Sequence, residues 1–440
     1  MTAIVAGSIH VTCSRAEAAA VCHDPRWRVD NPEFLQAERA GRFSRHLAPY
    51  IYAARPTPTG YVAPRGLLFD LPGIAGFDDR TVSLPTPAAP GPVVTLRDYQ
   101  REAVDAALKA RQGYVVAPCG AGKTTIGLEV IRRRGECALV LVHTRDLAAQ
   151  WESAIAAQLG EWGRQHVTVA TVQILWGTAA RAEKPLPPHG LLIMDECHHA
   201  PSRCFAEVVG RSPARYRYGL TATPDREDGL VPLIGWTFGS MLYSVDRACL
   251  LDDGHLVRPR LEMVRTGYAP ETVYTRAGDL DWAGIVRQLA EDPGRLYLVA
   301  DLARREANAG HVVLVLTTRV EHAQSVAVQL AEMGVPAHVV VGTDSAKRRA
   351  DRLADVRAGR VRVLIATQLA DEGLDLPILD RLILALPSRA EGRTVQRIGR
   401  IMRPAPGKGQ PVVYDLVDEH PACWGQWHRR RKAFATACGG

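Results

Sequence analysis

Long apolar runs are absent from this sequence of 440 residues. The longest, such as 138–142 and 312–316, fall far short of the roughly 18 apolar residues that a membrane-spanning helix needs. A secretory signal is also missing, because Ser8, His10 and Arg15 interrupt the apolar residues near the N-terminus too early. These absences argue against a membrane protein and against export. We therefore expect a globular, cytoplasmic protein with no membrane partner.

Evidence for a disulfide framework is equally lacking. The nine cysteines are odd in number and scattered from Cys13 to Cys438, which suits reduced thiols. Lysine is scarce, with six among the 54 lysines and arginines. The net charge of +7 and the pI near 9.0 are compatible with a polyanionic partner, although charge alone describes only solubility and non-specific attraction. The composition permits nucleic acid as a partner without proving it.

A proline-rich segment divides the chain. Pro85, Pro87, Pro90 and Pro92 stand among small residues, so this segment cannot hold a helix and should run extended. We predict a small N-terminal α+β accessory domain that ends with this linker, at residues 1–92.

Two series of short apolar strands follow, each alternating with amphipathic helical stretches. The first contains 114–118, 138–143, 167–171 and 191–196, and the second contains 311–317, 336–342, 361–367, 381–386 and 412–417. This alternation predicts parallel sheets covered by helices. The predicted fold class is α/β, with two tandem parallel-sheet domains at 93–255 and 256–440.

One of the few lysines stands in a glycine-rich stretch between a predicted strand and a predicted helix. The stretch is Gly120, Ala121, Gly122, Lys123, Thr124 and Thr125. Glycines let backbone N–H groups converge on a phosphate, and a helix N-terminus adds a favourable dipole. Lys123 would reach the β and γ oxygens as a compact charge, and Thr124 would offer a hydroxyl to Mg²⁺. The pattern predicts a nucleoside triphosphate site, against the alternative of a glycine-rich turn without a ligand.

Two carboxylates follow a later apolar strand. Asp195 would hold Mg²⁺ through its water shell, and Glu196 would orient and deprotonate the attacking water. An alternative takes the neighbouring Cys and His side chains as zinc ligands, namely Cys197, His198, His199 and Cys204. Three of these four are consecutive and no second cluster is near, whereas zinc needs donors that converge. Buried thiols and a polar coupling histidine fit the pattern better.

These motifs resemble those of the superfamily 2 helicases and translocases, in the branch whose second motif reads DEAH or a variant; here 195–198 read DECH. The resemblance covers roughly residues 94 to 420 and implies RecA-like domains that use ATP and Mg²⁺. It makes 96–100 the adenine-recognition segment, with Gln100 as the expected base contact. A tripeptide after GLTATP, made of Arg226, Glu227 and Asp228, narrows the resemblance to XPB-like and phage UvsW-like proteins, where it is associated with DNA opening.

The resemblance also assigns roles to residues along both parallel-sheet domains. Residues that would touch the nucleic-acid backbone, in addition to that tripeptide, are Thr144, Arg145, Thr171, Gln173, Thr318 and Thr367. Residues that would couple hydrolysis to nucleic-acid binding are His198, Thr221, Thr223 and Gln396.

The second domain is expected to complete the nucleotide site. By the same resemblance Gly373 and Asp375 lie near the nucleotide, and Arg400 and Arg403 are arginine fingers that stabilise charge on the γ-phosphate. An alternative is that 397, 400 and 403 form an exposed basic stripe on a helix.

The ends of the chain carry weaker signals. Between 39 and 65, five arginines occur without an acidic residue and alternate with aromatic residues, a composition that suits phosphates and stacked bases. We expect either a nucleic-acid-binding accessory domain or one that merely packs on the motor. Near the C-terminus, 429–432 are basic and belong to a predicted helix, which either contacts nucleic acid or is simply solvated.

The motifs and the resemblance together predict an ATP-dependent DNA helicase or translocase that acts as a monomeric motor. The XPB-like branch that it resembles implies 3′ to 5′ polarity. Its partner would be single-stranded, duplex, forked or branched DNA in repair, recombination or mobile-element biology. Three alternatives stay open: an RNA helicase, a nucleotide-dependent remodelling clamp or adaptor that does not travel, and the motor part of a restriction system. We find no convincing nuclease motif in this chain.

Overall fold

The computed structural model describes residues 1–39, 41, 43–74, 76–92, 94–181, 185–222, 229–275, 278, 280–367, 376–387 and 391–438; of 39, 177–181, 346, 391–393 and 396 it describes the backbone alone. The chain divides into two compact units, Met1–Val245 and Asp246–Gly440. Within the described residues, no helix combines the length and the apolar character that a membrane span requires.

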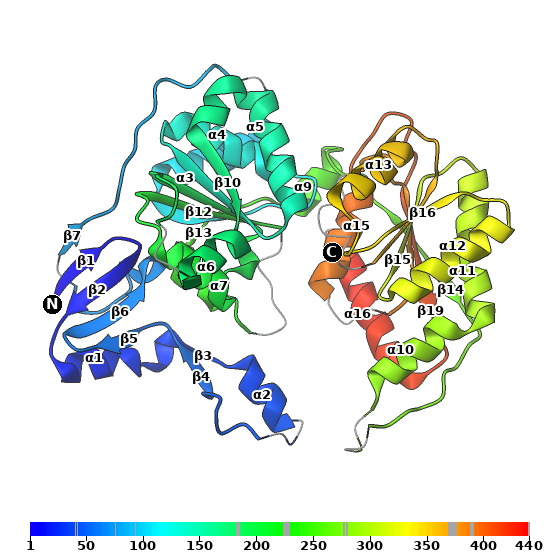
Figure 1. Cartoon of the computed structure of the whole chain (residues 1–440), viewed down its shortest axis with the longest axis horizontal. Helices are drawn as coiled ribbons and strands as arrows, with labels where there is room; N and C mark the ends of the chain where they lie inside the picture. Colours follow the sequence, from blue (N-terminus) through cyan, green and yellow to red (C-terminus); the bar gives the residue numbers. More distant parts are fainter. Residues whose placement is uncertain are drawn as a thin grey trace. The chain divides into compact units, whose positions relative to one another are not determined.

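The first unit begins with a mixed five-stranded sheet in the order β5-β6-β2-β1-β7, as Figure 1 shows. The elements of this region are β1 (Thr2–Val5), β2 (Ser8–Thr12), α1 (Arg15–Cys22), β3 (Arg28–Asp30), α2 (Pro32–Arg39), β4 (Tyr50–Tyr52), β5 (Arg55–Thr57), β6 (Gly60–Pro64) and β7 (Phe77–Asp79). Alternate residues are buried along β1 (Ala3 and Val5) and along β2 (Ile9 and Val11), as expected for strands with one covered face. The predicted α+β accessory region is confirmed.

The proline-rich segment runs extended along the rest of the first unit. Thr86 N donates to the Gly135 carbonyl oxygen at 2.8 Å, and the Trp162 indole donates to the carbonyl oxygen of Pro87 at 3.0 Å. No helix occurs at 85–92, because proline supplies no N–H and restricts its neighbours. Contacts place the accessory region and the sheet that follows in one compact unit. The boundaries predicted at 92 and 255 remain predictions.

A six-stranded parallel sheet, in the order β10-β9-β11-β12-β8-β13, is the core of the first unit. Its elements are α3 (Asp98–Lys109), β8 (Gln112–Val116), α4 (Lys123–Arg134), β9 (Ala138–Val142), α5 (Arg145–His166), β10 (Val167–Thr171), α6 (Val172–Arg181), β11 (Leu191–Asp195), α7 (Arg203–Arg211), β12 (Tyr216–Thr221), α8 (Pro232–Phe238) and β13 (Met241–Ser244). Helices cover both faces (Figure 1). The carboxyl ends of parallel strands share one edge, so the loops after β8, β9 and β11 and the last residues of β12 gather there.

The second unit holds another six-stranded parallel sheet, in the order β14-β19-β18-β15-β17-β16. Its elements are α9 (Arg247–Asp252), β14 (Arg260–Arg265), α10 (Trp282–Glu291), α11 (Pro293–Asn308), β15 (Val313–Thr317), α12 (Val320–Glu332), β16 (Ala337–Val340), α13 (Ala346–Arg357), β17 (Val363–Thr367), β18 (Arg381–Leu384), α15 (Glu391–Ile401), β19 (Val412–Val417) and α16 (Pro421–Ala437). All five predicted strands of this series are present. The α/β prediction with two parallel-sheet domains is confirmed.

The basic residues near the C-terminus lie on α16, and one of them is part of the core. Arg430 Nε donates to Asp415 Oδ1 at 2.5 Å, and its Nη2 donates to the Leu416 carbonyl oxygen at 3.0 Å. Both charged side chains are almost completely buried, at 6% and 1% exposed. The prediction that the whole cluster faces solvent or nucleic acid is wrong at Arg430, which holds α16 against β19.

Replacing Arg430 with alanine should destabilise the second unit by about 3–5 kcal/mol, because the Asp415 carboxylate would stay buried without its cation. Chemical denaturation followed by far-UV circular dichroism measures this loss. Arg429→Ala removes an exposed arginine from the same helix and should change the free energy of unfolding by less than about 0.5 kcal/mol. Equal effects of the two substitutions would contradict the structural role of Arg430.

Candidate active site

The glycine-rich loop joins β8 to α4, with two glycines in the left-handed region at φ 91° for Gly120 and 82° for Gly122. That region is readily accessible only to glycine. Tyr99 Oη and Gln100 Nε2 both donate to the Ala121 carbonyl oxygen, at 3.1 and 2.9 Å. A Cβ atom at Gly122 would lie 2.4 Å from Gln100 Nε2. Close packing therefore holds the loop, and α4 begins directly after it at Lys123.

Gln100 lies against this loop rather than in open space. Its side chain is 5% exposed, and its Oε1 accepts a hydrogen bond from Arg97 N at 3.1 Å while its Nε2 is bound to Ala121. Both ends of the amide are thus engaged within the protein. The base contact expected for Gln100 stays a prediction, and Tyr99 is a loop-binding neighbour that the sequence reasoning did not single out.

Lys123 and the two carboxylates of DECH meet at the carboxyl edge of the sheet. Lys123 Nζ lies 3.3 Å from Glu196 Oε1, with both side chains largely buried. Burial alone would lower the pKa of Lys123, but the charges of Glu196 and Asp195 outweigh it and raise the pKa above its ordinary value. Burial would raise the pKa of Glu196, but Lys123 and His198 hold it far below its usual range. The two charges stabilise each other.

Asp195 has a different electrostatic environment, although it is adjacent. Burial and the neighbouring charge of Glu196 raise the pKa of Asp195 above its ordinary value. Its Oδ1 accepts from the backbone N–H of Glu196 at 2.9 Å, and its Oδ2 accepts from the Trp151 indole at 2.9 Å. A buried carboxylate whose charge is disfavoured fits a site for a hard cation such as Mg²⁺, which prefers oxygen ligands.

The turn after β11 is strained at Glu196, whose φ of 51° makes it the one non-glycine residue with positive φ among those described. Past this turn, His198 Nδ1 lies 3.1 Å from Thr221 Oγ1 and 3.3 Å from Glu196 Oε2. His198 therefore connects the end of β11 with the end of β12. In the described part of the chain, no three His, Cys, Asp or Glu side chains gather as a metal site would require, so the zinc alternative finds no support there.

Four of the residues predicted to contact nucleic acid, namely Thr144, Arg145, Thr171 and Gln173, lie along the same edge of the first sheet. Thr144 caps α5 and accepts from Leu147 N at 3.3 Å, and Arg145 is exposed in the first turn. Gln173 Nε2 donates to the His143 carbonyl oxygen at 3.1 Å, and Thr171 ends β10. The structure thus brings these residues to the edge that holds Asp195, and their contacts with nucleic acid stay predictions.

In the second unit, the predicted residues lie at the ends of β15, β17 and α15. Thr367 is the last residue of β17 and pairs with Thr317, the last residue of β15. Thr318 follows Thr317 directly in the chain. Arg400 lies at the end of α15 and Arg403 shortly after it, both half-buried. Arg397 is only 4% exposed. The alternative of an exposed basic stripe is therefore wrong, because this part of α15 packs into the domain.

Lys408 holds the backbone that follows the predicted arginine fingers. Its Nζ donates to the carbonyl oxygens of Pro377 at 2.8 Å and Arg403 at 2.7 Å, and burial lowers its pKa to about 8. The ammonium group joins the segment after β17 to the end of the arginine-bearing segment. Sequence reasoning did not select Lys408, although the scarcity of lysine was a signal that could have done so.

Comparisons with known proteins match the two sheets separately. The family model described as type III restriction enzyme, res subunit, matches residues 93–226, and the helicase conserved C-terminal domain matches 295–405. A putative DNA 3′-5′ helicase Rad25 from Halobacterium salinarum is 31% identical over 74% of this chain and 55% of its own length. The DNA 3′-5′ translocase XPB2 from Sulfurisphaera tokodaii is 28% identical over 77% of this chain and 85% of its own length.

The chain belongs to the superfamily 2 helicases, in the XPB-like branch. The resemblance predicted from the motifs is confirmed, and the helicase domains imply nucleotide-dependent activity. The chain spans about half the length of some curated relatives that it matches, such as the Rad25 protein. A type ISP restriction-modification enzyme, LlaBIII, bound to DNA has the same fold, with a TM-score of 0.56 at 16% identity over 78% of this chain and 30% of that chain.

Several residues that the helicase resemblance selects fall outside the described structure. They are Thr223, Arg226, Glu227, Asp228, Gly373 and Asp375. Gln396 lies on α15 by its backbone, and its side chain is outside the description. Their roles stay predictions.

The basic and aromatic stretch of the accessory region is not one continuous surface. Tyr61 and Arg65 are 1% and 2% exposed, and Arg65 donates to the carbonyl oxygens of Ala214 and Arg215 at 2.5 and 3.2 Å. The expectation that this stretch is exposed to nucleic acid is therefore wrong for both residues. Tyr61 lies in the apolar core of the accessory region, and Arg65 joins this region to the segment before β12. Of the others, Arg55 is exposed.

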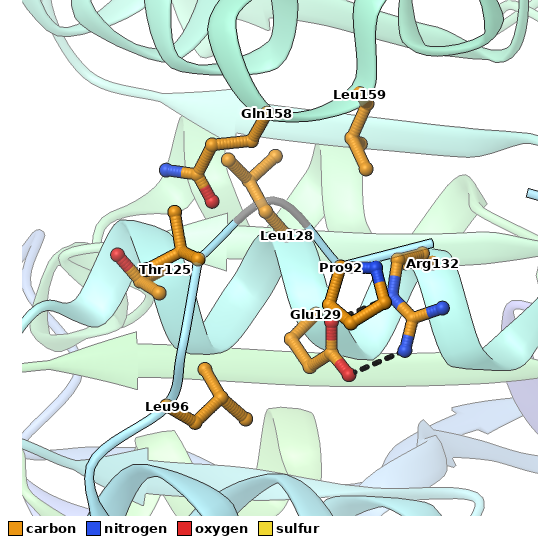
Figure 2. Close-up of a pocket in the computed structure, with 9 residues that line it drawn as sticks. Pro92, Leu96, Thr125, Leu128, Glu129, Arg132, Gln158 and Leu159 are labelled. Atoms are coloured by element: carbon orange, nitrogen blue, oxygen red, sulfur yellow. Dashed lines mark hydrogen bonds and ion pairs between the residues drawn. The ribbon is translucent and has the colours of Figure 1, made fainter. Parts of the chain in front are cut away.

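A small pocket lies beside the glycine-rich loop, where the segment before α3 crosses α4 (Figure 2). Leu96 and Leu128 give it apolar walls, and Thr125 of the predicted loop lines it too. Glu129 and Arg132 form an ion pair at 2.7 Å along its side. Leu96 of the predicted adenine-recognition segment and Thr125 of the predicted phosphate loop therefore line the same pocket.

Proposed function

We propose that the protein is an ATP-dependent DNA helicase or translocase that moves in the 3′ to 5′ direction. The observation that carries the proposal is the buried cluster at the edge of the first sheet, where Lys123 Nζ lies 3.3 Å from Glu196 Oε1 beside the buried Asp195. A cation, a base and a metal-binding carboxylate in one place match the needs of phosphoryl transfer to water. Family membership and the names of the relatives support this assignment.

ATP and Mg²⁺ are the proposed cofactors. The loop amides and Lys123 would hold the β- and γ-phosphates at the N-terminus of α4, with Gly120, Ala121, Gly122, Thr124 and Thr125 forming the rest of the cradle. Thr124 and Asp195 would hold Mg²⁺, whose charge helps neutralise the phosphate oxygens during transfer. Asp195 fits because burial disfavours its negative charge until a cation balances it.

The Lys123–Glu196 ion pair suggests how the base is activated. Lys123 keeps the pKa of Glu196 low in the structure, and a carboxylate with a very low pKa is a weak proton acceptor. Triphosphate oxygens would compete with Glu196 for Lys123. When Lys123 turns toward them, the pKa of Glu196 should rise, so that Glu196 takes a proton from the attacking water more readily.

The second domain would supply the arginines. We propose that Arg400 and Arg403 stabilise charge on the γ-phosphate as it transfers, because a guanidinium group stays charged and can bind two phosphate oxygens at once. Lys408 would keep Arg403 in place through its backbone carbonyl group. Closing of the domains on ATP and their release after hydrolysis would convert each cycle into a step along the strand.

DNA is the proposed track, and repair, recombination or mobile-element biology is the proposed setting. The Rad25 and XPB2 relatives are named as DNA 3′-5′ enzymes, and the RED tripeptide belongs to the same branch. Thr144, Arg145 and Gln173 stand at the catalytic edge of the first sheet, where binding of a strand backbone could influence Asp195 and Glu196. We further propose a monomeric motor.

The test compares ATP turnover with single-stranded DNA, duplex DNA and RNA, followed by strand displacement on a forked DNA with a 3′ tail. We expect DNA to stimulate turnover, RNA to do so much less, and displacement to require ATP and the 3′ tail. Stimulation by RNA alone would favour an RNA helicase. Turnover that ignores every nucleic acid would favour a remodelling clamp and contradict the proposal.

A further inference from the structure

A tryptophan from outside the recognised motifs binds the carboxylate that would hold Mg²⁺. Trp151 lies on α5, is 1% exposed, and donates from its indole Nε1 to Asp195 Oδ2 at 2.9 Å. The two residues are 44 positions apart in sequence. Contact between them therefore comes from the packing of α5 against the sheet, not from the DECH motif itself.

The hydrogen bonds to Asp195 restrict its rotation from both sides. Oδ1 accepts from the Glu196 backbone N–H, and Oδ2 accepts from Trp151. A carboxylate oxygen can accept more than one hydrogen bond, so each oxygen keeps a lone pair that could bind a metal or its water shell. Any residue except proline at position 196 would supply the backbone N–H, whereas the second donor depends on Trp151.

The indole ring is itself held in place by α4, the helix that begins at Lys123. A Cβ atom at Gly127 of α4 would lie 2.6 Å from Cη2 of Trp151 and 3.1 Å from Cδ1 of Leu220. Glycine lowers helix stability in such an interior position. Its presence allows the ring to lie directly against α4, and this close packing helps set the direction in which the indole N–H points.

We propose that Trp151 is a positioning residue for Asp195, holding the carboxylate in the orientation in which it serves Mg²⁺ and ATP. The inference rests on the proposed function. Groups that bind and orient metal ligands typically change metal affinity or activity by about 10–100-fold when they are removed. A ring that merely fills space beneath α4 would make the same apolar contacts without needing its N–H.

Trp151→Phe tests the proposal because it keeps an aromatic ring and removes the donor. We expect kcat for ATP to fall roughly 10–100-fold and the Mg²⁺ concentration for half-maximal turnover to rise. Binding of a fluorescent ATP analogue in EDTA should stay unchanged. Trp162→Phe is the matched control, since it alters another tryptophan of α5, beyond the break in that helix at Gly160, and loses an indole bond to the Pro87 carbonyl oxygen. It should resemble wild type in all three measurements.

A double-mutant cycle separates positioning from packing. If Trp151 acts through Asp195, Trp151→Phe should lose its effect on Mg²⁺-dependent nucleotide affinity in an Asp195→Asn background. An equal effect in both backgrounds would overturn the inference.

Further outcomes separate the role of Trp151 from the proposed function. If Trp151→Phe has the wild-type kcat and the wild-type Mg²⁺ dependence, and its turnover still needs Lys123, the proposed role of Trp151 is wrong. The proposed function would then remain supported. If the ATP turnover of the wild-type protein does not depend on Lys123, both the role of Trp151 and the proposed function are overturned. If thermal unfolding shows that Trp151→Phe is not folded, Gly127→Ala replaces it, because the new Cβ keeps the indole N–H but displaces the ring that carries it from its position at Asp195. That variant should show the same rise in Mg²⁺ requirement, and normal Mg²⁺ dependence would overturn the proposal.

Discussion

Replacing Lys123 with alanine should abolish ATP turnover, with a fall in kcat of at least about 10²–10³-fold. The substitution removes the cation proposed for the β- and γ-phosphates, and the stretch 117–125 contains no other basic residue. It also removes the ion-pair partner of Glu196, so that the buried carboxylate loses the charge that keeps its pKa low. Phosphate release in the presence of DNA measures the effect.

The sequence offers a matched control for this substitution. Lys109→Ala removes another of the six lysines, an exposed one at the end of α3, and should retain wild-type turnover. Circular dichroism and thermal unfolding would show whether both variants are folded. Wild-type phosphate release by folded Lys123→Ala would refute the proposed nucleotide site.

Replacing Arg400 with alanine should lower kcat by about 10³–10⁵-fold, the range associated with arginine fingers, with a much smaller loss of ATP binding. The guanidinium is proposed to act mainly on charge that develops during transfer, so its removal should affect the transition state more than the ground state. Single-turnover hydrolysis and fluorescent-nucleotide binding separate the two quantities. Arg403→Ala is expected to behave in the same direction.

Arg287→Ala is the matched control, since it removes an exposed arginine from α10 of the same unit. It should leave both turnover and binding close to wild type. If Arg400→Ala hydrolyses ATP at the wild-type rate, or loses ATP binding and turnover to the same extent, Arg400 is not an arginine finger.

Most strands of the two parallel sheets could be predicted because they are buried on both faces. Strands such as β9 and β15 read as uninterrupted apolar runs, which is the expected signature of a parallel sheet between two layers of helices. The strands that were not predicted have another composition. β12 contains Arg217, which is 1% exposed and donates to the carbonyl oxygens of Gly7 and Ser212 at 2.9 Å each.

A buried arginine of this kind makes a strand difficult to predict from the sequence. A charged residue in an apolar stretch normally indicates a surface or a loop, and nothing local indicates that distant carbonyl groups will surround this one. The same reason explains Arg65 and Arg430, which were expected on exposed surfaces and are buried. The Ala214 partner of Arg65 lies 149 positions away in the sequence, and the Asp415 partner of Arg430 lies on the preceding strand, β19.

The phosphate loop, DECH and the alternation of strands and helices were determined by the sequence alone. Each depends on residues within a few positions of one another: glycines that permit positive φ, a lysine at a helix start, and acids at a strand end. Neighbours in the chain stay neighbours in space, so their chemistry can be inferred before the fold is known.

Only the tertiary structure decided which side chains hold these groups in place. Trp151 reaches Asp195, Gln100 binds the Ala121 carbonyl oxygen, and Lys408 joins Pro377 to Arg403. Each contact joins separate segments, and it exists because helices pack on a sheet at distances and angles that depend on the whole core. Local sequence carries no record of those distances.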